Sequence, residues 1–183
     1  MDAALSRSTD DAEPHHYAVV SGGVRSRGPS AFLYSIPKSD ITAWTFLGHL
    51  VDVDSKAIKT PWTGERGLNW ECFGYFDLSG TAGDEAEGSK TRSFIMGGTE
   101  GGPRDTVDGV IEHEDAPART PRWQVWLSGP LVVGAEGGAP QMVVHIEGTI
   151  DPGCFYAGQT FSDGDRRLLI GESGPYLSML GLL

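Results

Sequence analysis

The residue best suited to take part in a chemical reaction is Glu71, which stands between Trp70 and Cys72 in the stretch LNWECFGYFDLSG. A buried, unpaired carboxylate is costly, so Glu71 lies either at an exposed strand end or in a site that requires it. An apolar aromatic wall raises the pKa of a carboxyl group by disfavouring its charged form, as a general acid needs. Trp70, Phe73 and Tyr75 could form that wall, and aromatic faces also stack on sugar rings. In the alternative interpretation, Glu71 faces solvent and Trp70 simply packs in the core.

Asp151 and Tyr156 are the other candidates for ligand contacts, in the stretch GTIDPGCFYAGQTF. Asp-Pro-Gly is a strong turn signal, and an Asp before Pro commonly caps a turn through its side chain. A structural role for Asp151 is therefore the alternative to a role in a site. The Tyr156 hydroxyl could point into a cleft, or its ring could pack between strands.

The sequence gives no basis for a metal or cofactor site, and we assign neither. The 5 His residues are dispersed, without HxH or HExxH spacing, and no GxSxG elbow or P-loop occurs. The stretch GGTEGGPR (97–104) lacks the Gly-Lys-Ser/Thr ending of a phosphate-binding loop, and its Gly pairs indicate turns. Cys72 and Cys154 are the only cysteines; without CxxC spacing, they are expected to be buried free thiols.

The charge balance excludes several classes of partner. With 25 acidic and 14 basic residues, the formal net charge is -11, which argues against binding to nucleic acid or to an anionic membrane. A neutral ligand such as a sugar would be indifferent to this charge. No apolar run approaches the roughly 20 residues of a membrane span. The first residues show no apolar signal-peptide core, so the chain as written is expected to be cytoplasmic.

The elements that must position these residues are short and β-rich. Runs rich in Val, Ile, Phe, Tyr and Trp are bounded by Gly, Asp, Ser or Pro, which is typical of antiparallel all-β proteins. The runs are 16–22, 30–36, 43–50, 70–78, 92–98, 122–129, 140–150, 153–161 and 166–172. Long polar loops are expected at 52–67, 79–91 and 99–121. The final YLSMLGLL is a possible short helix, and a β-sandwich and a β-propeller fit the strands equally well.

Three stretches of the chain carry a resemblance to a known family. NWECFGYFDLSG looks like a Trp-Glu-Cys motif, and GTIDPGCFYAGQTFSDGDRRLLIG looks like an Asp-x-Gly-x-Phe-Tyr-Ala segment followed by an Asp turn and paired Arg. HYAVVSGGVRSRGPSAFLYSIPKSDITAWTFLGHL looks like the strand pair that precedes the Trp-Glu-Cys motif. In this order they resemble glycoside hydrolase family 32, the invertase, inulinase and levanase group, in a fungal-looking version. Families 43 and 68 share the propeller, but the Glu-Cys context favours family 32.

This resemblance implies a fold, an activity and roles for the candidate residues. The fold would be all-β, a partial five-bladed β-propeller made of its middle blades, with antiparallel four-stranded sheets. The activity would be hydrolysis of β-fructofuranosides with retention, by two carboxylates about 5 Å apart. Glu71 matches the general acid/base, while Trp70, Asp151 and Tyr156 match residues around the substrate. The partner would be a small carbohydrate, without cofactor, and the oligomeric state is left open.

The sequence also departs from the family pattern. The nucleophile of the family is an Asp in an Asn-Asp-Pro-Asn-Gly-like motif, whereas the only Asp-Pro here is Asp151-Pro152. SRSTDDAEP stands where an Arg-Asp-Pro motif is expected. We therefore expect an unstructured segment at 1–15, a propeller fragment at 16–172 and a divergent tail at 173–183, truncated at both ends and inactive alone. The alternative is a non-catalytic or vestigial carbohydrate-binding fragment.

Overall fold

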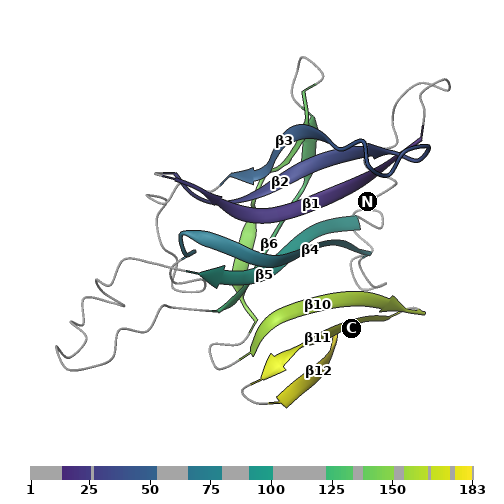
Figure 1. Ribbon diagram of the computed structural model, residues 1–183. Helices are drawn as coiled ribbons and strands as arrows, with labels where there is room; N and C mark the ends of the chain where they lie inside the picture. The colour runs from purple at the N-terminus through teal and green to yellow at the C-terminus, as the bar shows by residue number, and fades with distance from the viewer. Residues whose placement is uncertain are drawn as a thin grey trace, which may run out of the picture.

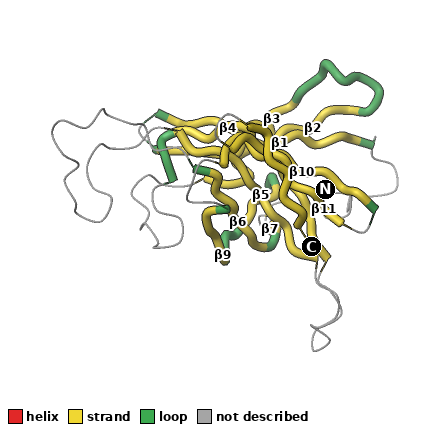
Figure 2. The backbone as a smooth tube through the Cα atoms, turned by 90° about the horizontal axis from the view of Figure 1, so that it is seen from below, coloured by secondary structure: helices red, strands yellow, loops and turns green. Residues whose placement is uncertain are grey.

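The computed structural model describes residues 14–25, 27–52, 66–79, 91–100, 123–133, 138–150, 155–164, 166–173 and 176–182. These residues form strands, turns and loops without any helix (Figure 2), which confirms the expected all-β class. It follows that the described residues include no apolar helix that could cross a membrane. The three expected long loops fall mostly outside the described residues.

The strands form three larger antiparallel sheets and one small one. The first sheet has the order β1-β2-β3, with β1 at His15–Val24, β2 at Gly28–Pro37 and β3 at Thr45–Asp52. The central sheet has the order β4-β5-β6-β9, from Asn69–Ser79, Thr91–Glu100, Gln124–Gly129 and Ile146–Thr149. The third sheet has the order β10-β11-β12, from Phe155–Asp163, Arg166–Ser173 and Tyr176–Leu182. The small sheet pairs β7 (Leu131–Val133) with β8 (Pro140–Met142).

The central sheet lies between the first and the third sheet (Figure 1), so both of its faces are covered. Separate antiparallel sheets that follow one another along the chain and pack face to face are the building plan of a β-propeller. The central sheet has the expected four strands, and the two flanking sheets have three each within the described residues.

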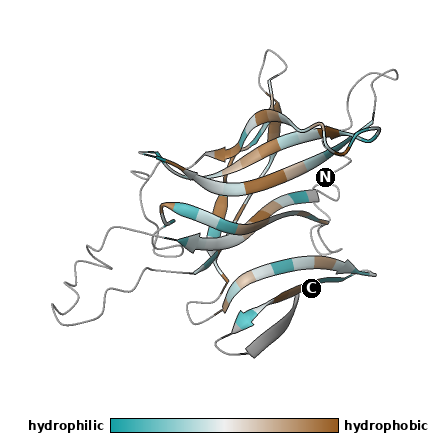
Figure 3. Ribbon diagram, in the orientation of Figure 1, coloured by the Kyte–Doolittle hydropathy of each residue, from teal (hydrophilic) through white to brown (hydrophobic). Residues whose placement is uncertain are grey.

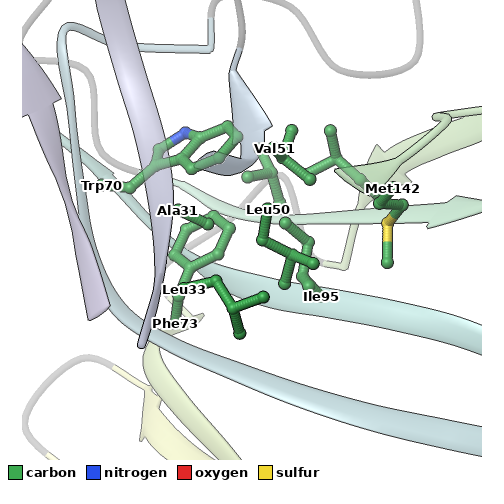
Figure 4. Close-up of a cluster of buried hydrophobic side chains, with 10 residues drawn as sticks. Ala31, Leu33, Leu50, Val51, Trp70, Phe73, Ile95 and Met142 are labelled. Atoms are coloured by element: carbon green, nitrogen blue, oxygen red, sulfur yellow. The ribbon is translucent and has the colours of Figure 1, made fainter. Parts of the chain in front are cut away.

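Two apolar clusters hold the three sheets together. Hydrophobic and polar residues alternate along the strands (Figure 3), so each face of the central sheet contributes its own set of side chains. The larger cluster joins the first sheet, the central sheet and β8 (Figure 4); its buried members are Ala31, Leu33, Leu50, Val51, Trp70, Phe73, Ile95, Val125, Leu127 and Met142. The smaller cluster joins the central and third sheets through Phe76, Met96, Phe155 and Leu169. Each large side chain buried in this way contributes about 1.5–3 kcal/mol to folding.

The structure differs from the sequence-based expectation in two segments. The possible helix at the C-terminal end is strand β12, which pairs antiparallel with β11 from Arg167–Leu182 to Ser173–Tyr176. The single strand expected at 140–150 is divided into β8 and β9. Pro130, which lacks an N–H, turns the chain out of the central sheet after β6, and β8 returns from the small sheet. Backbone bonds from Val143 to Pro130 and from His145 to Ser128 then guide the chain back to β9.

Candidate active site

Glu71 lies near the beginning of β4, at a break in the regular pairing between β4 and β5. Glu71 is opposite Gly98 and Gly74 is opposite Met96, so two residues of β4 face the single residue Gly97 of β5. Cys72, inside this β-bulge, has a φ of 54°, in the left-handed region that non-glycine residues rarely adopt. A bulge of this kind redirects side chains, and here it lies directly after the candidate acid.

The bulge in β4 separates the carboxylate from the aromatic residues around it in the sequence. Trp70 and Phe73 are three residues apart, yet both face the first sheet, where their rings stack with centroids 4.4 Å apart. Tyr75 packs against the same cluster. Glu71 faces the third sheet instead. The expectation that Trp70, Phe73 and Tyr75 form a wall beside Glu71 is therefore wrong. Ordinary alternation already places Trp70 on the face opposite to Glu71, and the break in alternation turns Phe73 and Tyr75 to that face as well.

Trp70 is a core residue in this structure. Its side chain is 1% exposed, one ring face lies against Phe73, and its indole N–H donates to the carbonyl oxygen of Arg66 at 3.0 Å. A ring covered in this way offers no face on which a sugar could stack. The position of Trp70 thus corresponds to the packing interpretation and not to a direct substrate contact.

Tyr156 is the aromatic residue that the structure brings to Glu71. It lies near the beginning of β10, and its hydroxyl group donates to the Glu71 carboxylate oxygen Oε2 at 2.7 Å. The carbonyl oxygen of Thr99 lies 3.4 Å from the same hydroxyl group. Both Glu71 and Tyr156 are partly exposed. A carboxyl group held in this way at an accessible position can give or take a proton.

Gly98 provides the space for the Tyr156 ring. A Cβ atom at Gly98 would lie 2.6 Å from Cε2 and 2.8 Å from Oη of Tyr156. On the other face of β5, a Cβ atom at Gly97 would lie only 1.8 Å from the Phe73 ring. The interpretation of this Gly pair as a turn is wrong, because both glycines lie within a strand that passes closely between two aromatic rings. Gly inside a run of strand residues is the signal that could have identified this close approach.

The remaining candidates are less informative. Asp151 and Cys154 lie outside the described residues, so their roles stay predictions. Cys72 is a free cysteine with an exposed side chain, contrary to the expected buried thiol, because the bulge turns it away from both clusters. Groups of three or more His, Cys, Asp or Glu side chains suitable for a metal ion do not occur in the described part of the chain.

A second polar cluster lies further along β4, on the face toward the first sheet. The Tyr75 hydroxyl and the Ser93 hydroxyl each lie 2.8 Å from Asp77 Oδ1 and 2.8 Å from one another. Burial, opposed by the Ser93 hydrogen bond and reinforced by Asp77, raises the pKa of Tyr75 far above its usual value. This cluster stabilises β4 against β5 but belongs to the opposite face from Glu71.

The fold is similar to part of the fold of two fungal enzymes, a β-fructofuranosidase and a fructosyltransferase. The chain is similar to a β-fructofuranosidase of Aspergillus kawachii complexed with glycerol, with a TM-score of 0.62 and 21% identity. It is also similar to the wild-type fructosyltransferase from A. japonicus, with a TM-score of 0.61 and 22% identity. The sequence matches no protein-family model and no curated protein.

These similarities confirm the partial β-propeller that the family resemblance implies. They cover 93% and 91% of this chain but only 27% and 28% of the two solved chains. The chain therefore spans little more than a quarter of the length of the proteins it matches. At this level of identity the similarity supports the fold alone, and the activity must be inferred from the residues of the site.

Proposed function

We propose that this chain carries the acid/base half of a retaining β-fructofuranosidase site, with Glu71 as the general acid/base. The observation that carries the proposal is the 2.7 Å hydrogen bond from the Tyr156 hydroxyl to Glu71 Oε2. It joins the Trp-Glu-Cys stretch and the Phe-Tyr-Ala stretch, two segments that are 85 positions apart in the sequence and that the family resemblance selects independently. A propeller fold similar to that of a β-fructofuranosidase supports the same assignment.

The proposed chemistry gives each side chain a definite task. Glu71 would protonate the oxygen of the leaving group and then take a proton from the attacking water, as the acid/base carboxyl group does in retaining glycosidases. Tyr156 would hold one carboxylate oxygen and so restrict the carboxyl group to one orientation. The second carboxylate, which attacks the anomeric carbon, must come from an Asp motif that this sequence does not contain.

The proposal therefore predicts binding without turnover for the 183-residue chain. Titration of the ¹⁵N-labelled protein with sucrose should give saturable NMR shifts at Cys72, Gly98 and Tyr156, whereas maltose, which lacks a fructosyl group, should give none. Fructose release from sucrose and inulin should stay at background, and Glu71→Gln should not change it. Absence of any sucrose-dependent shift at these residues would exclude the site. Fructose release that is abolished by Glu71→Gln would contradict the inference that the chain lacks a nucleophile.

The missing nucleophile supports a second function, that of a non-catalytic or vestigial carbohydrate-binding fragment. The two functions differ in whether a nucleophile completes the site. Glu71→Gln should keep much of the sucrose affinity in either case, because an acid/base group acts mainly in the transition state. The non-catalytic function requires instead that the coding sequence upstream contain no in-frame Asn-Asp-Pro motif. An upstream in-frame motif would instead favour the enzyme.

A further inference from the structure

The β4 bulge has a counterpart in the third sheet. Between β10 and β11, Tyr156 is opposite Glu172 and Gln159 is opposite Ile170, so two residues of β10 face the single residue between these partners. Ala157 in this second bulge has a φ of 51°, close to the 54° of Cys72. Each bulge directly follows one member of the hydrogen-bonded pair formed by Glu71 and Tyr156. The direction of both side chains therefore depends on how firmly the two bulges are held.

A glutamine from the third sheet holds the β4 bulge. The side-chain amide of Gln159 donates from Nε2 to the carbonyl oxygen of Cys72 at 2.7 Å. Gln159 extends from β10 toward the same edge of β4 as Tyr156, because the β10 bulge places these two residues, three positions apart, on one face. Its Oε1 atom lies 3.8 Å from the position that a Cβ atom would take at Gly74. The amide thus spans the gap between the two sheets beside Glu71.

A glutamine from the central sheet holds the β10 bulge in return. Gln124, at the beginning of β6, is fully buried, with 0% of its side chain exposed. Its Oε1 atom accepts from the backbone N–H of Gly158 at 3.2 Å, and its Nε2 atom lies 3.5 Å from the carbonyl oxygen of Gly158. Both halves of the amide are therefore directed at one residue of the bulge. Within the described residues, the Gln124 amide meets the backbone of the third sheet, and this contact offsets the cost of burying a polar side chain in the core.

We propose that Gln159 and Gln124 are positioning residues that fix the Glu71 carboxylate against the Tyr156 hydroxyl by holding the two bulges; their importance for catalysis rests on the proposed function. A non-glycine residue at positive φ persists only where its surroundings restrain it. Gln159 restrains Cys72, the residue after Glu71, and Gln124 restrains Gly158, two residues after Tyr156. The two contacts are reciprocal, since each sheet supplies the amide that holds the bulge of the other (Figure 1 shows β4, β5 and β10 side by side).

The test uses Gln159→Glu in the full chain, because Gln159 is exposed and its replacement leaves the core intact. The substitution keeps the size of the side chain but replaces the donor to Cys72 with a carboxylate oxygen that the carbonyl group repels. NMR of the ¹³C,¹⁵N-labelled protein then follows three signals: the Glu71 Cδ, the Tyr156 Cζ and the HN–Hα coupling of Cys72, which reports on its φ angle. We expect the Cys72 coupling to change from its wild-type value. The Glu71 Cδ signal should move toward its position in Tyr156→Phe, and the Tyr156 Cζ signal should move toward its position in Glu71→Gln.

Two further variants separate positioning from other effects. Gln159→Ala removes the amide without adding charge and must displace the same signals, whereas Gln141→Glu in β8, also exposed, must leave them unchanged. If the Glu71 and Tyr156 signals stay at their wild-type positions in both Gln159 variants, the positioning role is refuted. These signals are read without substrate, so displaced signals in a protein that shows no sucrose-dependent shifts would support the positioning role and refute only the proposed function.

Discussion

The clearest single test of the site geometry is Gly98→Ala in β5. Gly98 is opposite Glu71, and the Tyr156 ring passes directly over it. The added Cβ atom would lie 2.6 Å from Cε2 and 2.7 Å from Cζ of Tyr156, closer than real Cβ atoms come to other heavy atoms. The substitution therefore acts on the Tyr156–Glu71 pair while changing neither residue.

The cost follows from the distances. To restore an ordinary contact of 3.4 Å from 2.6 Å, the ring must withdraw by 0.8 Å. A similar displacement of the hydroxyl group would stretch its 2.7 Å bond with Glu71 to the limit of hydrogen bonding. A hydrogen bond to a charged group contributes about 1.5–3 kcal/mol to stability, and partial exposure lowers that value. We expect Gly98→Ala to lower the free energy of unfolding by about 1–2 kcal/mol.

Urea denaturation measures this cost, and Gly74→Ala in the neighbouring strand provides the control. A Cβ atom at Gly74 would meet only Gln159 Oε1 at 3.8 Å, an ordinary contact, so its effect should be small. In a Tyr156→Ala background the cost of Gly98→Ala should fall to that of the control, because the ring is gone. The reasoning is refuted if Gly98→Ala costs no more than Gly74→Ala, or if its cost is unchanged without the ring.

Three other predictions concern the surroundings of the site. Gly97→Ala should lower the free energy of unfolding in urea by about 3 kcal/mol or more, a larger cost than that of Gly98→Ala. The added Cβ atom would lie 1.8 Å from the Phe73 ring, which is buried and cannot withdraw. Above its ordinary pKa of 10.0, Tyr75 keeps its proton only in the folded chain. The free energy of unfolding should therefore fall with rising pH more steeply than in Tyr75→Phe, by at most about 1.4 kcal/mol per pH unit and less after solvent screening; parallel curves would contradict this. Glu147→Gln should cost about 2–3 kcal/mol in thermal unfolding, because Arg66 then loses its partner in a largely buried ion pair, whereas Arg66→Met combined with Glu147→Leu should cost less than Glu147→Gln alone.

Much of the architecture was accessible from the sequence. Strand-length runs such as 70–78 and 166–172 appear as β4 and β11 with small changes at their ends, because apolar alternation and Gly or Asp punctuation act locally. The helix considered at the C-terminal end was wrong, since pairing with β11 overrides a weak local preference. The break between β8 and β9 depends on where Pro130 lies relative to the sheet, which local patterns do not reveal.

The candidate site was only partly accessible. Glu71 and Tyr156 were selected as candidates, but their hydrogen bond joins two sheets and depends on two bulges that leave no mark in apolar alternation. Trp70 is next to Glu71 in the sequence, but strand alternation directs the two side chains to opposite faces, and the bulge after Glu71 adds Phe73 to the face of Trp70. Gln159 carries no comparable sequence signal, because a glutamine within a strand is ordinary until its backbone partner is known.

The repetition of the same bend in β4 and β10 bears on how such a protein acquires its chemistry. Only one of the two strands carries a carboxylate directly before the bend, and the other carries a phenol. The bend is therefore common to β4 and β10 and does not depend on the acid, whereas β1 pairs with β2 without a register shift. On such a scaffold a new reactive group arises from a single side-chain replacement, because the path of the backbone that presents it already exists.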